Sequence, residues 1–140
     1  MTRCLLDTDI LSEILKGKNP TVTARTKEYL ATHGSLTTSA ISVAEIVYGL
    51  RRVGREDRIR EFESTASIAD VLPFDDGAAR LAGRINGDLV RKGRVIGMPD
   101  VMIAAIAVRA GIPVVTGNQA HFEQVRLVGY ELSIQNWRVP

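Results

Sequence analysis

The chain has 140 residues, of which 45% are hydrophobic and 24% are charged, and its formal net charge is +2. This composition is ordinary for a globular protein and excludes a disordered chain, while the length suffices for one domain with a sizeable core, expected over residues 1–140. The small positive charge permits a polyanionic partner but does not demand one.

The predicted elements alternate between strands and helices from one end of the chain to the other. Prolines open two of the helices, glycines follow three of them, and short apolar runs mark the strands. In chain order, we expect a strand over residues 3–6, helices over 9–16 and 20–32, a strand over 36–39, helices over 42–52 and 55–67, a strand over 70–73, helices over 75–92 and 99–110, and strands over 113–116 and 130–134.

Several of these helices carry apolar patterns that indicate how they pack. The helix over 55–67 is charged and shows only Ile59 and Phe62 to a core, whereas the helix over 99–110 is apolar all round and is expected to be buried. The alternation predicts an α/β fold, a three-layer α/β/α sandwich with a central, mostly parallel sheet. Single apolar stripes run along two other helices: Val43, Ile46, Val47 and Leu50 on one, and Ala78, Leu81, Ala82, Ile85 and Leu89 on the other.

The sequence gives no sign of a disulfide or of a membrane segment. Cys4 is the only cysteine, so we expect it to be a small buried residue in a reducing compartment. Asp7 and Asp9 interrupt the apolar N-terminal run before it could serve as a signal, and the longest apolar run, over residues 101–108, is too short to span a bilayer. We therefore expect a cytoplasmic protein with no membrane association.

Acidic and polar side chains follow the strands in a way that brings them to one edge of the sheet. Asp7 and Asp9 come just after the first strand, and Asn118 comes just after the fourth. Glu45 and Asp100 lie in the first turns of helices that start at the same edge. Open α/β sheets bind ligands beyond the carboxyl ends of their strands. The sequence therefore predicts that these side chains gather at one site.

Clustered carboxylates repel one another unless a proton or a cation neutralises them. Mg²⁺ and Mn²⁺ are hard ions that take oxygen ligands, and they support phosphoryl-transfer chemistry by activating water and stabilising the leaving oxygen. His33 and His121 are the only histidines and are far apart in the sequence, so no zinc site is indicated. The pattern favours a Mg²⁺ or Mn²⁺ site.

Each of these residues also has a structural interpretation that its spacing leaves open. Ser42 and Glu45 have the spacing of a capping box. Asp100 stands at a helix start, where the helix dipole favours a carboxylate. Asp9 could cap the first helix, and Asn118 could be an ordinary turn residue. Asp7 has the least satisfactory structural explanation, because it follows an apolar strand directly.

Three further features have mainly structural explanations. Asp75 is most simply the N-cap of the helix that follows it. The basic run Arg91, Lys92 and Arg94 ends a helix, where cations offset the dipole, although it could also meet phosphates. Trp137 is expected to pack in the core, because a single aromatic residue is not a stacking platform for bases.

Four segments that contain the polar residues stand in a fixed order along the chain. LLDTDILSE contains Asp7, SAISVAEIVYG contains Glu45, GMPDVMIAAIA contains Asp100, and VVTGNQAHF contains Thr116 and Asn118. The ordered set resembles the motifs of the PIN-domain nucleases and, within them, those of the VapC-type toxins of bacterial toxin–antitoxin pairs. The closing tail to residue 137 is also typical, so the resemblance covers nearly the whole chain.

The resemblance implies a PIN-like fold and a Mg²⁺- or Mn²⁺-dependent endoribonuclease that hydrolyses RNA phosphodiester bonds. It also implies a homodimer and a cognate antitoxin protein that forms a complex with the toxin and blocks its site. Many PIN nucleases have an aspartate where this chain has Asn118; an asparagine offers a carbonyl oxygen without the charge. The site residues implied are Asp7, Glu45 and Asp100 as catalytic residues and metal ligands, Asn118 as a further ligand, and Asp9 and Thr116 as supporting polar residues.

Two other interpretations stay open. The Asp-Thr-Asp sequence at residues 7–9 is similar to the nucleophile motif of haloacid-dehalogenase-type phosphohydrolases. That class also requires a lysine and a later pair of acidic residues around the phosphate. Here no lysine follows Lys92, and Asp100 has no acidic neighbour. The uncharged Asn118 leaves room for a non-catalytic PIN-like RNA-binding module. The intact acidic residues speak against such a module.

Overall fold

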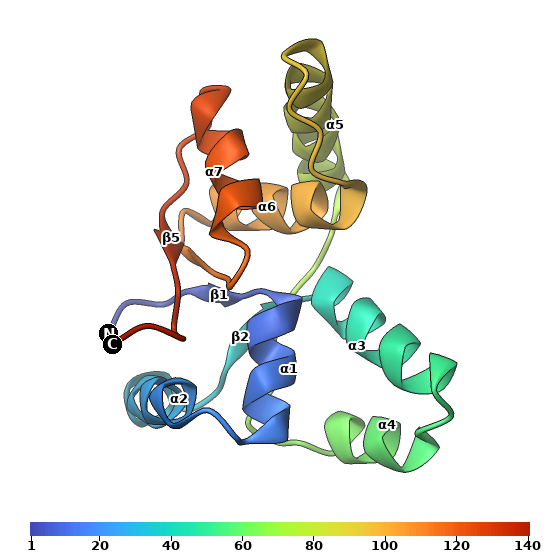
Figure 1. The fold of residues 1–140 in the computed structure, drawn as a ribbon, viewed down its shortest axis with the longest axis vertical. Helices are drawn as coiled ribbons and strands as arrows, with labels where there is room; N and C mark the ends of the chain where they lie inside the picture. Colours follow the sequence, from blue (N-terminus) through green and yellow to red (C-terminus); the bar gives the residue numbers. More distant parts are fainter.

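The computed structural model describes residues 1–140 and contains a five-stranded sheet with seven helices (Figure 1). The strand order is β3-β2-β1-β4-β5, and every neighbouring pair is parallel. The elements in chain order are β1 (Leu5–Leu6), α1 (Thr8–Lys16), α2 (Pro20–His33), β2 (Thr37–Ser39), α3 (Ala40–Arg52), α4 (Glu56–Glu63), β3 (Asp70–Leu72), α5 (Asp76–Arg91), α6 (Met98–Ala110), β4 (Val114–Val115), α7 (Gln119–Leu127) and β5 (Ile134–Gln135).

The sheet lies between two layers of helices. Helices α1 to α4 lie on one side of it and α5 to α7 on the other (Figure 1). Alternate residues of the central strands serve the two cores, as the twofold period of a strand requires. Leu5 and Val114 pack with α5, α6 and α7, whereas Leu6 and Val115 pack with α1 and α2. The predicted three-layer α/β/α architecture with a parallel sheet is confirmed.

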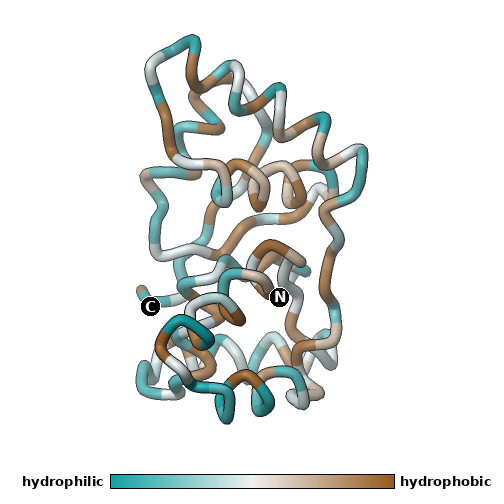
Figure 2. Tube along the Cα trace, turned by 90° about the vertical axis from the view of Figure 1, so that its right-hand side faces the viewer, coloured by the Kyte–Doolittle hydropathy of each residue, from teal (hydrophilic) through white to brown (hydrophobic).

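The hydropathy of the helices follows the predicted patterns. Helix α6 contributes a fully apolar segment to the core, and four residues of the predicted stripe on α5 are buried while Leu81 is partly buried. In Figure 2 the tube alternates between brown and teal along the outer helices, as expected for amphipathic segments. Cys4 and Trp137 are fully buried, as predicted, and burial raises the pKa of the Cys4 thiol to about 12. No helix has the length and hydrophobicity needed to cross a membrane.

Three regions differ from the predicted elements. Helix α7 lies where no element is expected, because only Phe122 and Val125 of its residues are buried and its sequence gives a weak apolar pattern. A last strand is present as predicted, but the predicted bounds of 130–134 are wrong, since pairing is confined to Ile134–Gln135 on the outer side of β4. Helix α4 ends at Glu63, earlier than predicted, where the hydroxyls of Ser64 and Thr65 donate to the carbonyl of Glu61.

The predicted capping box of Ser42 and Glu45 is wrong. Helix α3 begins at Ala40, and its N-cap is Ser39, whose hydroxyl accepts from the Ser42 backbone N–H at 3.0 Å. Glu45 therefore lies in the second turn, too far along the helix to reach the N-cap. Its position needs an explanation other than capping.

We predict that Ser39→Ala lowers the free energy of unfolding by about 1 kcal/mol, because it removes the N-cap of α3. Glu45→Gln changes it by less than about 0.5 kcal/mol, because the glutamine oxygen still accepts from its neighbour. Urea denaturation of the two variants and the wild type measures both. A larger loss in Glu45→Gln than in Ser39→Ala would contradict this account of the cap.

Candidate active site

Asp7 stands at the centre of the carboxyl edge of the sheet, directly after β1. The neighbouring strand β4 is paired in register, Leu6 with Val115, and so places Thr116 beside it. The Thr116 hydroxyl donates to Asp7 Oδ2 at 2.8 Å, and the Thr8 backbone N–H donates to Oδ1 at 2.7 Å. Asp7 is thus also the N-cap of α1, a role that the sequence had suggested for Asp9.

The environment of Asp7 opposes its charge. Only 5% of the residue is exposed, and it has no salt-bridge partner among the ion pairs of the structure. Burial is the largest cause that raises the pKa of Asp7, to about 7, and the charges of Asp9 and Asp100 raise it further, against the hydrogen bonds from Thr116 and Thr8. A carboxylate at this position lacks a compensating cation.

Glu45 reaches the same edge from α3. The Thr8 hydroxyl donates to Glu45 Oε1 at 2.6 Å and lies 2.9 Å from the hydroxyl of Ser42. This contact connects the first turn of α1 with α3, two helices that pack against each other. Glu45 is half-buried, and its hydrogen-bond partner Thr8 is the residue that follows Asp7 in the sequence.

Asp100 and Asn118 meet at the start of two other helices. Asp100 lies in the first turn of α6, and Asn118 is the residue before α7. The ring nitrogen Nδ1 of His121 lies 2.7 Å from Asp100 Oδ2 and 2.8 Å from Asn118 Nδ2. The Asn118 backbone N–H also donates to Thr116 Oγ1 at 2.9 Å. These contacts bring the third and fourth motifs together.

Asp9 has a cationic neighbour, unlike Asp7. It accepts from the Gly117 backbone N–H at 3.0 Å, and Arg138 Nη1 lies 3.7 Å from its carboxylate. The same arginine bonds to Glu13 and lowers the pKa of that carboxyl. A Cβ atom at Gly117 would lie 1.9 Å from Arg138 Nη1 and 2.7 Å from Asp9 Oδ2, so a larger residue here would displace these two side chains.

A cleft of about 810 Å³ opens over this edge and extends between α1, α3 and α4. Five of the six predicted site residues line it, and Thr116 lies beneath, fully buried. Its far end is lined by three cations, Lys16, Arg52 and Arg58, together with Glu61 and the apolar Leu50 and Phe62. The five site residues that line the cleft are Asp7, Asp9, Glu45, Asp100 and Asn118.

Other charged residues that the sequence singles out lie elsewhere. Asp75 caps α5 as predicted, accepting from the Ala78 backbone N–H at 2.9 Å. The basic run does not line the cleft. Arg91 and Lys92 end α5, and Arg94 donates to Gln124 Oε1 at 2.7 Å. The helix-end interpretation of this run therefore agrees with the structure.

The oxygen donors of the cleft fit a hard divalent cation. Three carboxylates and an amide carbonyl form the kind of ligand set that Mg²⁺ and Mn²⁺ take. As the side chains stand, no three His, Cys, Asp or Glu residues are placed to hold one ion. Glu45 bonds to Thr8 and Asp100 to His121. Chelation would need these two carboxylates to turn toward Asp7.

Comparison with known proteins agrees with this arrangement. A sequence profile of the PIN domain matches residues 4–127. The chain is 33% identical over 126 residues to the tRNA(fMet)-specific endonuclease VapC of Shigella flexneri, covering 89% of this chain and 93% of the relative. It is 30% identical over 138 residues to ribonuclease VapC2 of Haemophilus influenzae, covering 98% and 99%. The chain belongs to the PIN-domain family, among the VapC ribonuclease toxins of toxin–antitoxin systems.

Solved structures support the same assignment to the VapC family. The structure superposes on the DNA-bound VapBC complex of Salmonella typhimurium with a TM-score of 0.83 at 30% identity, over 98% of this chain and 99% of the other. The predicted family and the PIN-like fold are thus confirmed. Membership in the VapC family speaks against the phosphohydrolase interpretation of residues 7–9.

The sequence did not indicate several residues that shape this VapC site. Thr8 holds Glu45, His121 bridges Asp100 and Asn118, and Arg138 lies beside Asp9. A signal for His121 exists in its spacing three residues after Asn118, which places both on one face of a helix start. No local signal brings Arg138 from the C-terminal tail to α1.

The pKa of Asp7 leads to a prediction about stability. The pKa of Asp7 in the folded state, about 7, lies above the usual value of 3.8 for an aspartate, so stability that is fully present below about pH 4 is lost as the pH rises to about 7. Asp7→Asn removes this loss. Without metal, at pH 8.5, we expect the variant to be more stable than the wild type by up to about 4 kcal/mol, with little difference at pH 4.

Denaturation in EDTA at both pH values tests this expectation. Asp76→Asn, at the exposed start of α5, is the matched control and should show no such pH-dependent gain. A variant Asp7→Asn that is less stable than the wild type at pH 8.5 would show that the ionised Asp7 is a structural cap.

Proposed function

We propose that this VapC-family ribonuclease is a Mg²⁺- or Mn²⁺-dependent endoribonuclease whose catalytic and metal-binding residues are Asp7, Glu45 and Asp100. The observation that carries the proposal is the buried carboxylate of Asp7, which shares a cleft with the carboxylates of Glu45 and Asp100 and has no cationic partner. A divalent cation would neutralise it, and Asn118 would add a carbonyl oxygen. Asp9 and Thr116 support the site from its edge and from beneath.

The side chains of the cleft would orient the reaction. Thr116 and the Thr8 backbone fix Asp7, and the Thr8 hydroxyl fixes Glu45. A divalent cation bound here supplies positive charge to the scissile phosphate and lowers the pKa of a coordinated water. Asp9 has Arg138 as a cationic neighbour at 3.7 Å, whereas Asp7, Glu45 and Asp100 form no ion pair with an arginine or lysine.

The cationic end of the cleft fits the RNA strand beyond the scissile phosphate. Helix α1 runs from Thr8 at the acidic end to Lys16 at the other, a distance of about 12 Å at the rise of an α-helix. Lys16 and Arg52 form no ion pair, and the pairing of Arg58 with Glu61 is loose, at 3.8 Å. We infer that these cations bind phosphates next to the cleaved bond.

A direct test of the proposal compares metal binding and cleavage in the same variants. Glu45→Gln and Asp100→Asn should each weaken Mn²⁺ binding in calorimetry and lower the rate of RNA cleavage by at least about a hundredfold, the scale of losing one positioned catalytic group. Their melting temperatures without metal should match that of the wild type. The tRNA named for the Shigella relative is the first substrate to try.

Two results would decide against the proposal. Full cleavage by Glu45→Gln at ordinary Mn²⁺ concentration would reduce the site to Asp7 and Asp100. If the wild type cleaves no RNA with any divalent cation, the chain is a non-catalytic RNA-binding module. Partial rescue of the variants at high Mn²⁺ would support a role as ligands.

A second prediction concerns the cationic end. The triple variant Lys16→Ala, Arg52→Ala, Arg58→Ala should raise KM for RNA by about tenfold or more, because phosphate contacts are lost, while kcat changes little. The control removes three exposed cations outside the cleft: Lys18, Lys27 and Arg60. Equal effects of the two triple variants on KM would show that only net charge matters.

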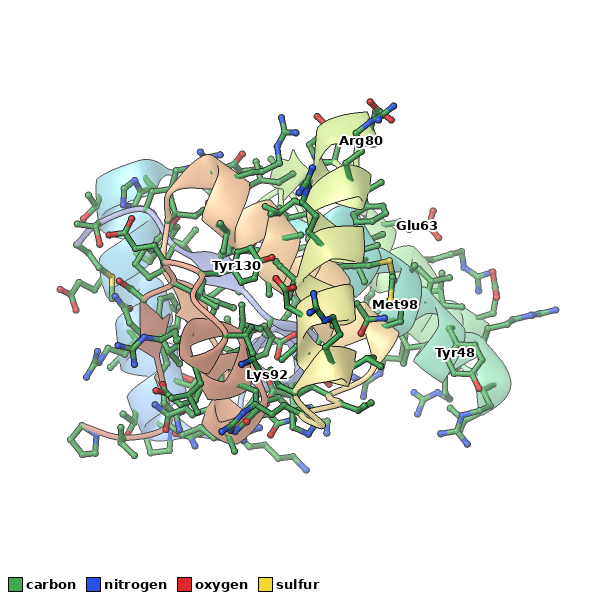
Figure 3. All side chains as sticks on the ribbon, turned by 90° about the horizontal axis from the view of Figure 1, so that it is seen from above. Tyr48, Glu63, Arg80, Lys92, Met98 and Tyr130 are labelled. Atoms are coloured by element: carbon green, nitrogen blue, oxygen red, sulfur yellow. The ribbon has the colours of Figure 1, made fainter.

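We also propose a cognate antitoxin and a homodimer as partners. Relatives have been solved as the VapBC complexes of Salmonella typhimurium and of nontypeable Haemophilus influenzae. Tyr48 and Met98 are exposed apolar residues, at 68% and 43%, and lie on the same side of the molecule in Figure 3, where a second copy could cover them. Light scattering should give twice the 15.3 kDa of one chain; a monomeric mass would exclude the homodimer.

A further inference from the structure

His121 occupies a position that the acidic motifs do not explain. It lies in the first turn of α7, and one ring nitrogen, Nδ1, is 2.7 Å from Asp100 Oδ2 and 2.8 Å from Asn118 Nδ2. No other side chain lies within hydrogen-bond distance of both Asp100 and Asn118. Neither packing nor capping accounts for it, because 43% of its side chain is exposed and the buried anchors of α7 are Phe122 and Val125.

Asn118 gives a second, independent observation. It is the N-cap residue of α7, and asparagine at this position usually accepts from a backbone N–H of the helix. Here its side chain makes no capping bond. The amide is turned instead toward His121, and the residue lines the cleft. A favourable helix cap, worth about 1 kcal/mol, is therefore forgone for the contact with the histidine.

While the Asn118 NH₂ group faces His121, the Nδ1 atom cannot satisfy both of its contacts. If Nδ1 carries a proton, it donates to Asp100 and faces the NH₂ group of Asn118 as a second donor. If Nδ1 carries none, it accepts from Asn118 and faces the lone pairs of Asp100. With the Asn118 amide turned over, both oxygens could accept from one N–H, but the NH₂ group would then point away from His121.

These arrangements differ in what Asn118 can offer to a cation. When Nδ1 accepts from the NH₂ group, the hydrogen bond holds the amide in the orientation that leaves the carbonyl oxygen of Asn118 free to act as a ligand, since an amide NH₂ group binds no cation. That arrangement competes with the contact between His121 and Asp100. A cation held by Asp100 removes the competition, because the carboxylate then has a better partner.

We propose that His121 is a positioning residue of the divalent cation site: its Nδ1 accepts from the Asn118 NH₂ group and so directs the Asn118 carbonyl oxygen to the cation. The inference rests on the proposed metal site. It adds His121 as the residue that orients Asn118, the uncharged fourth ligand. Partners that orient metal ligands in this way typically change affinity by 10- to 100-fold when removed.

The test compares three replacements of His121 by the affinity for Mn²⁺, measured calorimetrically without RNA. His121→Phe keeps a ring but loses Nδ1, and His121→Gln places its amide near the Nε2 position, beyond Asn118. Both should weaken Mn²⁺ binding by about tenfold or more. His121→Asn places an acceptor close to the Nδ1 position and should bind within about threefold of the wild type. His33→Phe, at the only other histidine, is the control.

A second arm uses Asn118→Asp. A carboxylate presents oxygen whichever way it is turned, so Mn²⁺ binding to this variant should no longer depend on His121. The loss caused by His121→Phe should therefore disappear in the double variant. At saturating Mn²⁺, His121→Phe should recover kcat with unchanged KM for RNA, and its melting temperature without metal should equal that of the wild type.

The outcomes separate this inference from the proposed function. If the wild type binds no Mn²⁺, or binds it equally well without Asp7 and Asp100, the metal site itself is wrong. If Mn²⁺ binding requires those carboxylates but His121→Phe and His121→Gln bind like the wild type, His121 is not a positioning residue. Equal losses in His121→Asn and His121→Phe would also overturn the inference, because the acceptor at Nδ1 would then be irrelevant.

Discussion

The carboxylate of Asp7 is buried at the carboxyl edge of a parallel sheet, where no cation of the chain reaches it. Two donors, the Thr8 backbone and the Thr116 hydroxyl, hold it in place but leave its pKa at about 7. An isolated buried charge is costly, and nearby carboxylates add to the cost. The fold around Asp7 maintains this arrangement, since β1 and β4 place Asp7 and Thr116 side by side.

The rest of the site follows from this uncompensated charge. Glu45 and Asp100 bring two more carboxylates to the cleft, whereas Asp9 is paired with Arg138. Negative charge is thus concentrated where a cation can neutralise it, and positive charge lies at the far end, where we propose that RNA phosphates bind. Stability given up at such a site is a common cost of function. In this protein the loss of stability comes from the ionisation of one residue, Asp7.

Much of the fold was predictable because it depends on local patterns. The strand–helix alternation, the buried α6 and the stripe on α5 are periodic in sequence, and the rule that parallel strands end at one edge then brings Asp7, Glu45 and Asp100 together. The capping box failed because α3 begins at Ala40, earlier than its apolar pattern suggests. The start of a helix is hard to predict from sequence patterns when its N-cap is also the last residue of a strand, as Ser39 is.

The unpredicted parts depend on contacts between distant segments. His121 belongs to a helix with only two buried residues, so neither α7 nor the ring's contact with Asp100 has a strong periodic signal. Arg138 reaches Asp9 from the other end of the chain, through packing of the C-terminal tail and the space left at Gly117. The cations of the cleft lie on three helices whose relative positions the sequence alone does not give.

Proton release on Mn²⁺ binding tests the central claim most directly. At pH 6 the metal-free Asp7 carries a proton for most of the time, because its pKa is about 7, and a cation can bind only by displacing it. Calorimetry in two buffers with different ionisation enthalpies should show close to one proton released per Mn²⁺ at pH 6 and almost none at pH 8.5. His121→Asn should show the same release, which excludes the histidine as its source. Mn²⁺ binding at pH 6 without proton release would contradict the account.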